Sequence, residues 1–169
     1  MCYADKCRFN LDTSFIGYKV FIVNYTYMKK VHIGCDHAGF ELKEKLKSYL
    51  KHEFEVMDHG TFSADSVDYP DYAHPLADAV EKQGDMGILI CGSANGVAMA
   101  ANKHEQIRAA VCWLPEIAQL ARLHNNANIV CIPARFVTNE MAEQITHVFL
   151  STAFEGGRHE KRVNKIGCI

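Results

Sequence analysis

The residues best suited to catalysis lie at the end of the apolar run Met86–Cys91 and directly after it. This run ends on a thiol and continues into Gly92-Ser93-Ala94-Asn95-Gly96. Small residues there let backbone amides approach a ligand closely, and a helix beginning near Val97 would favour negative charge. Amides beside the Cys91 thiol and the Ser93 hydroxyl suit a small oxyanion such as an enediolate. The loop matches neither G-x-x-x-x-G-K-[ST] nor a convincing G-x-G-x-x-G, so nucleotide binding is poorly supported. The alternative for Cys91 is a buried structural thiol, as most cysteines are.

A carboxylate and an imidazole stand side by side at Asp36 and His37, where an apolar run from Val31 gives way to a helical pattern. Together they could bind a sugar hydroxyl and an anion, because free backbone N–H groups point outward at the start of a helix. Alternatively, Asp36 is only the N-cap of that helix and His37 only a first-turn residue. The residues by themselves leave both interpretations open.

A second imidazole lies in His124-Asn125-Asn126, at the end of another helical pattern. His124 could act as a general acid near neutral pH. A lone histidine at a helix terminus more often only complements the helix dipole.

Two arginines near the C-terminus, Arg158 and Arg162, stand four residues apart. On a helix both guanidinium groups would share one face, and two such groups suit a phosphate monoester. A solvated basic patch is the ordinary alternative.

Metal and hydrolytic motifs are missing from the sequence. The nine histidines form no H-x-x-x-H or H-E-x-x-H pattern, and the cysteines lack zinc spacing, so we expect no metal. There is also no G-x-S-x-G elbow for a nucleophilic serine.

Charge and cysteine content narrow the class of protein further. A net charge of -2 provides no global field for nucleic acid or an anionic membrane, so any anion must be bound locally. The seven cysteines are odd in number and several end apolar runs, which indicates reduced thiols and a cytoplasmic protein.

The chain of 169 residues is long enough for one sizeable domain. We assign residues 28–169 to that domain and residues 1–27 to an N-terminal extension, with an edge strand at Lys19–Tyr25 as the alternative. The apolar stretch Phe15–Val23 is interrupted by Gly17 and Lys19 and is too short to span a bilayer.

From Val31 onward, short apolar runs alternate with longer helical patterns, which predicts a three-layer α/β/α Rossmann-like sandwich around a five-stranded parallel sheet. Ligands bind such sheets beyond the carboxyl ends of the strands. The expected strands are Val31–Cys35, Glu55–Asp58, Met86–Cys91, Arg108–Cys112 and Ile129–Ile132, and the expected helices are Phe40–Lys51, Tyr72–Gln83, Gly96–Lys103, Glu116–His124 and Asn139–Leu150.

Six motifs occur in one order: GCDHAGF (34–40), DYPDYA (68–73), ICGS (90–93), AANK (100–103), ARLHNNAN (121–128) and FEGGRH (154–159). With them the chain, from Met28 to its C-terminus, closely resembles the ribose-5-phosphate isomerase B / galactose-6-phosphate isomerase family. The resemblance implies cofactor-free and metal-free interconversion of ribose 5-phosphate and ribulose 5-phosphate in the non-oxidative pentose phosphate pathway. It also implies a homodimer or dimer of dimers with active sites shared between subunits.

The resemblance assigns roles to individual residues. Cys91 matches the base that moves a proton between C2 and C1 through a cis-enediolate, and His124 matches the acid that opens the sugar ring. The amides of Gly92, Ser93, Ala94, Asn95 and Gly96, with the Ser93 hydroxyl, match the loop around the enediolate oxygens. The substrate-binding positions of the family are matched by six residues: Asp36, His37, Asn125, Arg135, Arg158 and Arg162. His124, Asn125 and the C-terminal arginines are expected to reach into the partner's pocket.

One departure from the family pattern lies at Ala94-Asn95, where members commonly carry glycine followed by a small residue or asparagine. The alternatives are a galactose-6-phosphate isomerase subunit and a non-catalytic flavodoxin-like module that binds a phosphorylated ligand. For Cys91 to act as a base, we expect helix-terminal amides to lower the pKa of its thiol.

Overall fold

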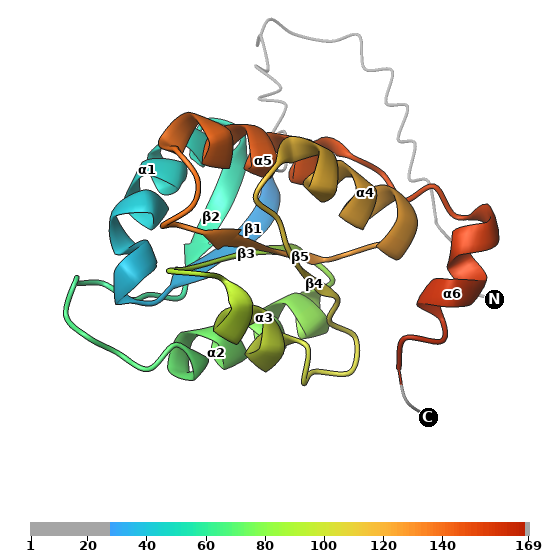
Figure 1. Ribbon diagram of the computed structural model, residues 1–169, viewed down its shortest axis with the longest axis horizontal. Coiled ribbons are helices and arrows are strands. Elements are labelled where there is room, and N and C mark those ends of the chain that lie inside the picture. The colour runs from blue at the N-terminus through green and yellow to red at the C-terminus, as the bar shows by residue number, and fades with distance from the viewer. Residues whose placement is uncertain (1–27, 168–169) are drawn as a thin grey trace, which may run out of the picture.

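The computed structural model describes residues 28–167, so the predicted extension and its alternative edge strand lie outside the described residues. Within that range, five strands form one all-parallel sheet in the order β2-β1-β3-β5-β4 (Figure 1). The strands are β1 (Lys29–Cys35), β2 (Phe54–Asp58), β3 (Met86–Cys91), β4 (Ala109–Val111) and β5 (Ile129–Pro133). The predicted parallel sheet is confirmed.

Helices cover both faces of this sheet, as Figure 1 shows. The α-helices are α1 (Phe40–Leu50), α2 (Pro70–Gln83), α3 (Asn95–Ala101), α4 (Pro115–Asn125), α5 (Asn139–Ser151) and α6 (Glu160–Val163), with 3₁₀ turns η1 (His37–Gly39) and η2 (Gly157–His159). None of these helices is long and apolar enough to cross a membrane.

The buried apolar side chains form two clusters, one on each face of the sheet. Residues of α1, α4 and α5, among them Leu46 and Phe149, pack in one cluster. Residues of α2 and α3, among them Leu76 and Val97, pack in the other. Side chains of β3 and β5 alternate between these clusters, which is why those two strand sequences are apolar throughout.

Three predicted helix starts are late by one or two residues: α3 begins at Asn95, one residue before the predicted start, and prolines mark the beginnings of the other two. α2 begins at Pro70 and α4 at Pro115, each with proline in the first helical turn. Proline fits there because it lacks the N–H that the first turn leaves unpaired anyway.

The order of strands reverses between β1 and β3, since the chain first adds β2 on one side of β1 and then β3 on the other. In a sheet of this kind the crevice between the two diverging connections is the ordinary ligand site. The connection after β1 consists of Asp36, which is the N-cap of η1, followed by η1 itself, which begins at His37. The connection after β3 is the loop that follows Cys91.

Candidate active site

The two connections bring Cys91 and Asp36 into direct contact. The Cys91 thiol donates to Asp36 Oδ2 over a distance of 2.9 Å. The other carboxylate oxygen of Asp36 accepts from the backbone N–H of Gly39 at 3.1 Å, which caps η1. Asp36 is therefore both an N-cap and a partner of the thiol, so the two interpretations left open by the sequence are compatible.

This contact overturns the expectation of an acidic thiol. Burial and the hydrogen bond and charge of the Asp36 carboxylate raise the pKa of Cys91 above its ordinary value. The amides of Ala94 and Ser93 act in the opposite direction, as expected, but they do not offset the first two effects. Cys91 therefore rests as a protonated thiol that donates a hydrogen bond to the Asp36 carboxylate.

The pocket around this pair has a volume of about 300 Å³. Its lining residues come from the ends of β1, β3 and β5: Asp36, His37, Ala38, Cys91, Gly92, Ser93, Arg135 and Phe136. The Arg135 guanidinium lies over Gly92, so close that a Cβ added at Gly92 would stand 3.2 Å from Arg135 Cζ. The pocket thus combines one thiol, one carboxylate, one imidazole and one guanidinium.

His37 is oriented by the segment that leads into α2. Its Nδ1 accepts from the backbone N–H of Val67 at 3.3 Å. The tautomer that accepts at Nδ1 carries its proton on Nε2, which is a donor suited to an anion or a sugar hydroxyl.

The loop after Cys91 takes a backbone shape that few side chains tolerate. Ala94 has φ of 64°, in the left-handed region, and is fully buried. At Gly96 an added Cβ would lie 2.7 Å from the Tyr69 ring, so this glycine lets the start of α2 pack against α3. Ala94 therefore adopts a left-handed conformation that glycine would take at no steric cost.

The remaining predicted site residues lie at the other edge of the sheet. In parallel α/β folds the helices run opposite to the strands, so the end of α4 lies near the amino ends of the strands, far from Cys91. His124 and Asn125 stand there, and Figure 1 shows α6 beyond the same edge. Arg158 and Arg162 are exposed on η2 and α6. Within one chain the structure does not bring these four residues to Cys91.

His124 is held in a stack with another histidine. The rings of His124 and His159 are 4.2 Å apart and nearly parallel, and His124 Nε2 lies 3.8 Å from Glu155 Oε2. These three side chains could together present ligand atoms to a metal ion. However, the Arg158 guanidinium donates to His159 Nε2 at 3.4 Å, which places a positive charge where the cation would bind.

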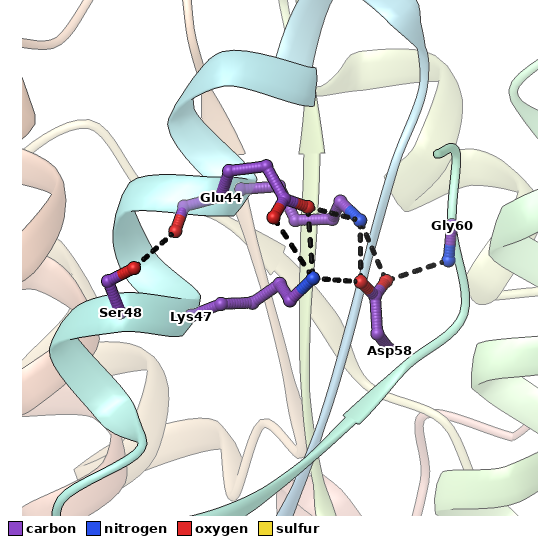
Figure 2. Close-up of polar contacts among 6 residues, drawn as sticks. Glu44, Lys47, Ser48, Asp58 and Gly60 are labelled. Carbon is purple, nitrogen blue, oxygen red and sulfur yellow. Dashed lines mark hydrogen bonds and ion pairs between the residues drawn. The ribbon is translucent and has the colours of Figure 1, made fainter. Parts of the chain in front are cut away.

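A buried ion-pair cluster, which the sequence did not reveal, supports the Asp36 side of the pocket. Lys43 is fully buried, and its ammonium donates to both oxygens of Asp58 at 2.8 Å. Lys47 also contacts Asp58, and the backbone N–H of Gly60 donates to Asp58 at 2.9 Å (Figure 2). Burial would raise the pKa of Asp58, but the hydrogen bonds from the lysines and the Gly60 amide hold it below its usual range.

The segment fixed by Asp58 is bonded to the end of β1. Cys35 N–H donates to the carbonyl of Gly60, and the N–H of Thr61 donates back to the Cys35 carbonyl at 2.8 Å. Cys35 directly precedes Asp36. The charge cluster therefore holds the backbone from which the Asp36 carboxylate reaches Cys91.

Comparisons with known proteins agree with this architecture. The Ribose/Galactose Isomerase family model matches residues 31–166. Ribose-5-phosphate isomerase B of Escherichia coli (strain K12) is 46% identical over 144 residues, covering 84% of this chain and 97% of the relative.

Solved structures give the same result. A ribose 5-phosphate isomerase from Thermotoga maritima matches with a TM-score of 0.80 and 52% identity, covering 82% of this chain and 97% of that one. Ribose-5-phosphate isomerase B from Mycoplasma genitalium, solved with bound ribulose-5-phosphate, matches with a TM-score of 0.80 and 44% identity over 83% of this chain and 95% of that one. The chain described here belongs to the Ribose/Galactose Isomerase family.

Proposed function

We propose that the protein interconverts ribose 5-phosphate and ribulose 5-phosphate, a step of the non-oxidative pentose phosphate pathway, without a cofactor. The observation that carries this proposal is the Cys91–Asp36 pair in a pocket at the reversal of strand order. Family membership and the ribulose-5-phosphate bound to the Mycoplasma genitalium relative support the choice of substrate.

In the proposed reaction, Cys91 moves one proton between two adjacent carbons. The thiol must first be deprotonated, and Asp36 Oδ2, at 2.9 Å, is the acceptor in contact with it. The thiolate then takes the proton from C2 of the open-chain aldose and returns it to C1, while the hydroxyl proton moves from O2 to O1. Between these transfers the substrate is a cis-enediolate, and proton transfer of this kind contributes roughly 100- to 10,000-fold to the rate.

The amides of the loop from Gly92 to Gly96 and the Ser93 hydroxyl are proposed to stabilise the enediolate oxygens. Ser93 lines the pocket, and the side chains of both Ser93 and Asn95 are exposed, so a substrate can reach them. Preorganised donors of this kind act most strongly on charge that develops during the reaction. Arg135 lies over Gly92 and adds a positive charge to the same pocket.

The acid and the phosphate ligands are proposed to come from a second copy of the chain. His124 would open the sugar ring, with Asn125 beside it, and Arg158 and Arg162 would bind the phosphate together with His37. The distance between the two sheet edges supports a homodimer, or a dimer of dimers, with shared sites. Large apolar side chains left exposed near the carboxyl edge also support a covering partner, because such surfaces commonly mark interfaces: Met99, Trp113 and Phe136.

We also propose a cytoplasmic location and a domain division. Buried free thiols, which support a reducing compartment such as the cytoplasm, occur at Cys35, Cys91, Cys112 and Cys131. The family match from residue 31 to residue 166 supports the assignment of residues 1–27 as an extension to the isomerase domain.

The test is turnover of ribose 5-phosphate, with galactose 6-phosphate as the competing substrate, combined with solvent deuterium incorporation at C2. Cys91→Ala should stay folded, bind ribose 5-phosphate and lose the exchange. Cys112→Ala is the matched control, because Cys112 is a buried thiol of the core cluster; it should lower the melting temperature and keep the exchange. Near-normal deuterium incorporation in folded Cys91→Ala would refute the proposed base. Turnover of galactose 6-phosphate alone, or of neither sugar, would favour the two alternative functions.

A further inference from the structure

A second cluster of ligand-type side chains lies between α2 and the loop that follows α3. Asp78 and Glu81 project from α2, and His104 comes from the loop before β4. One ligand atom from each of these three side chains lies within 4.8 Å of the other two. His104 lies far from Asp78 and Glu81 in the sequence, so the absence of metal motifs along the chain does not address this cluster.

The distances within the cluster suit a shared cation better than direct contacts. His104 Nδ1 lies 3.5 Å from Asp78 Oδ1 and 3.8 Å from Glu81 Oε2. Both distances are too long for good hydrogen bonds. They are close to the separation of about 3.3 Å between neighbouring ligand atoms around a tetrahedral ion with bonds of about 2.0 Å.

Each of the three side chains is also held by a contact through its other polar atom. Lys82 Nζ donates to Asp78 Oδ2 at 2.7 Å, and the backbone N–H of Gln106 donates to Glu81 Oε1 at 2.7 Å. His104 Nε2 lies 3.0 Å from His74 Nδ1. Outer contacts of this kind orient metal ligands and fix the histidine tautomer. When His104 Nε2–H donates to His74, the lone pair of His104 Nδ1 faces the two carboxylates.

We propose that Asp78, Glu81 and His104 form a binding site for a divalent first-row transition metal such as Zn²⁺. One imidazole and two carboxylates are ligands that such ions accept. The site carries two negative charges, and Lys82, which contacts Asp78, binds the outer oxygen Oδ2. His104 is mostly buried, whereas Asp78 is nearly half exposed, so the ion has a path from solvent and keeps room for water.

The consequence of binding is structural. The metal would join the second half of α2 to the loop between α3 and β4, which is at the amino edge of the sheet and away from Cys91. Binding should therefore raise the melting temperature, because an ion that binds only the folded state stabilises that state. The proposed isomerase does not depend on it.

The test is titration of the full chain with Zn²⁺, followed by melting temperature and by competition with a chromophoric chelator. His104→Gln and Asp78→Asn should abolish the Zn²⁺-dependent rise in melting temperature. His74→Phe, which removes only the outer contact, should weaken binding by about 10- to 100-fold. Glu105→Gln is the matched control, since it removes one charge from the same loop outside the cluster and should bind Zn²⁺ as the unmodified chain does.

Co²⁺ provides a second measurement that separates this site from cysteines and from the His124 group. The expected complex shows visible d–d bands without thiolate-to-cobalt charge transfer, and it persists in His124→Gln. Circular dichroism verifies that each variant is folded. Binding that survives in folded His104→Gln and Asp78→Asn, that disappears in Glu105→Gln or His124→Gln, or that shows thiolate charge transfer overturns the proposal.

Discussion

At the residue scale, the contact between Cys91 and Asp36 determines the protonation of the proposed base. The sequence identified both residues as site candidates, because each ends a strand beside a helix start. It could not give the direction of the pKa shift. The loop amides lower the pKa of Cys91, whereas burial of the sulfur and the charge of Asp36 raise it. Only the folded chain shows that the Asp36 carboxylate contacts the thiol.

Asp36→Asn is expected to lower the pKa of Cys91. The substitution removes the negative charge and the strong acceptor that favour the thiol, and asparagine can still cap Gly39 through its side-chain oxygen. The rate of Cys91 alkylation by iodoacetamide, followed on the Cys91 peptide by mass spectrometry, should rise at lower pH in Asp36→Asn than in the unmodified protein. Isomerase activity should nevertheless fall, because the variant lacks the proton acceptor.

The control for this prediction is His37→Asn, which changes the neighbouring residue without touching the thiol. Its alkylation profile should follow that of the unmodified protein. If the pH profile of Cys91 alkylation in Asp36→Asn is unchanged or moves to higher pH, the Asp36 carboxylate does not raise the pKa of the Cys91 thiol.

Ala94, the departure from the family pattern, adopts the left-handed conformation that favours glycine. A left-handed conformation costs an ordinary residue roughly 1–2 kcal/mol relative to glycine. The Ala94 methyl is fully buried in the cluster beneath α2 and α3, and that burial offsets part of the cost. The sequence could flag the position, but the φ of 64° required the structure.

At the element scale, the cluster of Lys43 and Asp58 links α1, β2 and the segment that supports β1. A lysine in an amphipathic helix pattern is ordinarily taken as exposed, since lysine is almost never fully buried unless paired. The pairing here is between a helix and the end of the following strand, so no local pattern reveals it. The three central strands β1, β3 and β5 were predictable because they contain short apolar runs buried on two faces, whereas the outer strands β2 and β4 are only partly buried.

Asp58→Ala is expected to destabilise the fold by about 3–5 kcal/mol, because it leaves the buried Lys43 ammonium without its main partner. Lys43→Met should cost less, since Asp58 keeps Lys47 and the Gly60 amide and the methionine fills the buried space. Chemical denaturation of both variants measures the difference. Glu44→Gln is the control: the Glu44 carboxylate is nearly half exposed and lies 3.0 Å from the ammonium groups of Lys43 and Lys47, so its loss should change stability by about 0–1 kcal/mol.

The contribution of Asp58 to folding stability is expected to decrease as the pH falls. The pKa of Asp58 is depressed in the folded state, so its contribution is present above the pKa of the unfolded chain and is lost as pH falls through the folded pKa. The unmodified protein should therefore lose more stability on acidification below about pH 4 than Asp58→Ala does. Equal acid sensitivity of the two proteins, or a larger loss in Lys43→Met than in Asp58→Ala at neutral pH, would contradict this account.

At the scale of the whole molecule, the predicted site divides between two edges of one sheet. Sequence reasoning grouped Cys91 with His124 and the C-terminal arginines through family resemblance. Topology explains why one chain cannot assemble them: strand ends meet at the carboxyl edge, and the helix ends that carry His124 and Asn125 meet at the amino edge. Both edges carry polar side chains, but each edge has only some of the proposed catalytic and substrate-binding residues.

Shared sites predict that two inactive proteins can restore activity when their subunits are mixed. Cys91→Ala and His124→Ala homodimers each have a defect in both sites, whereas a mixed dimer has one site with both defects and one with neither. Random pairing in a two-fold dimer should therefore recover about a quarter of the unmodified turnover of ribose 5-phosphate. Mixing Cys91→Ala with Asp36→Ala is the control, because both residues lie in one pocket and every site then keeps a defect. Recovery in the control mixture, or none in the first mixture after subunit exchange is verified by mass, would mean that each chain builds its own complete site.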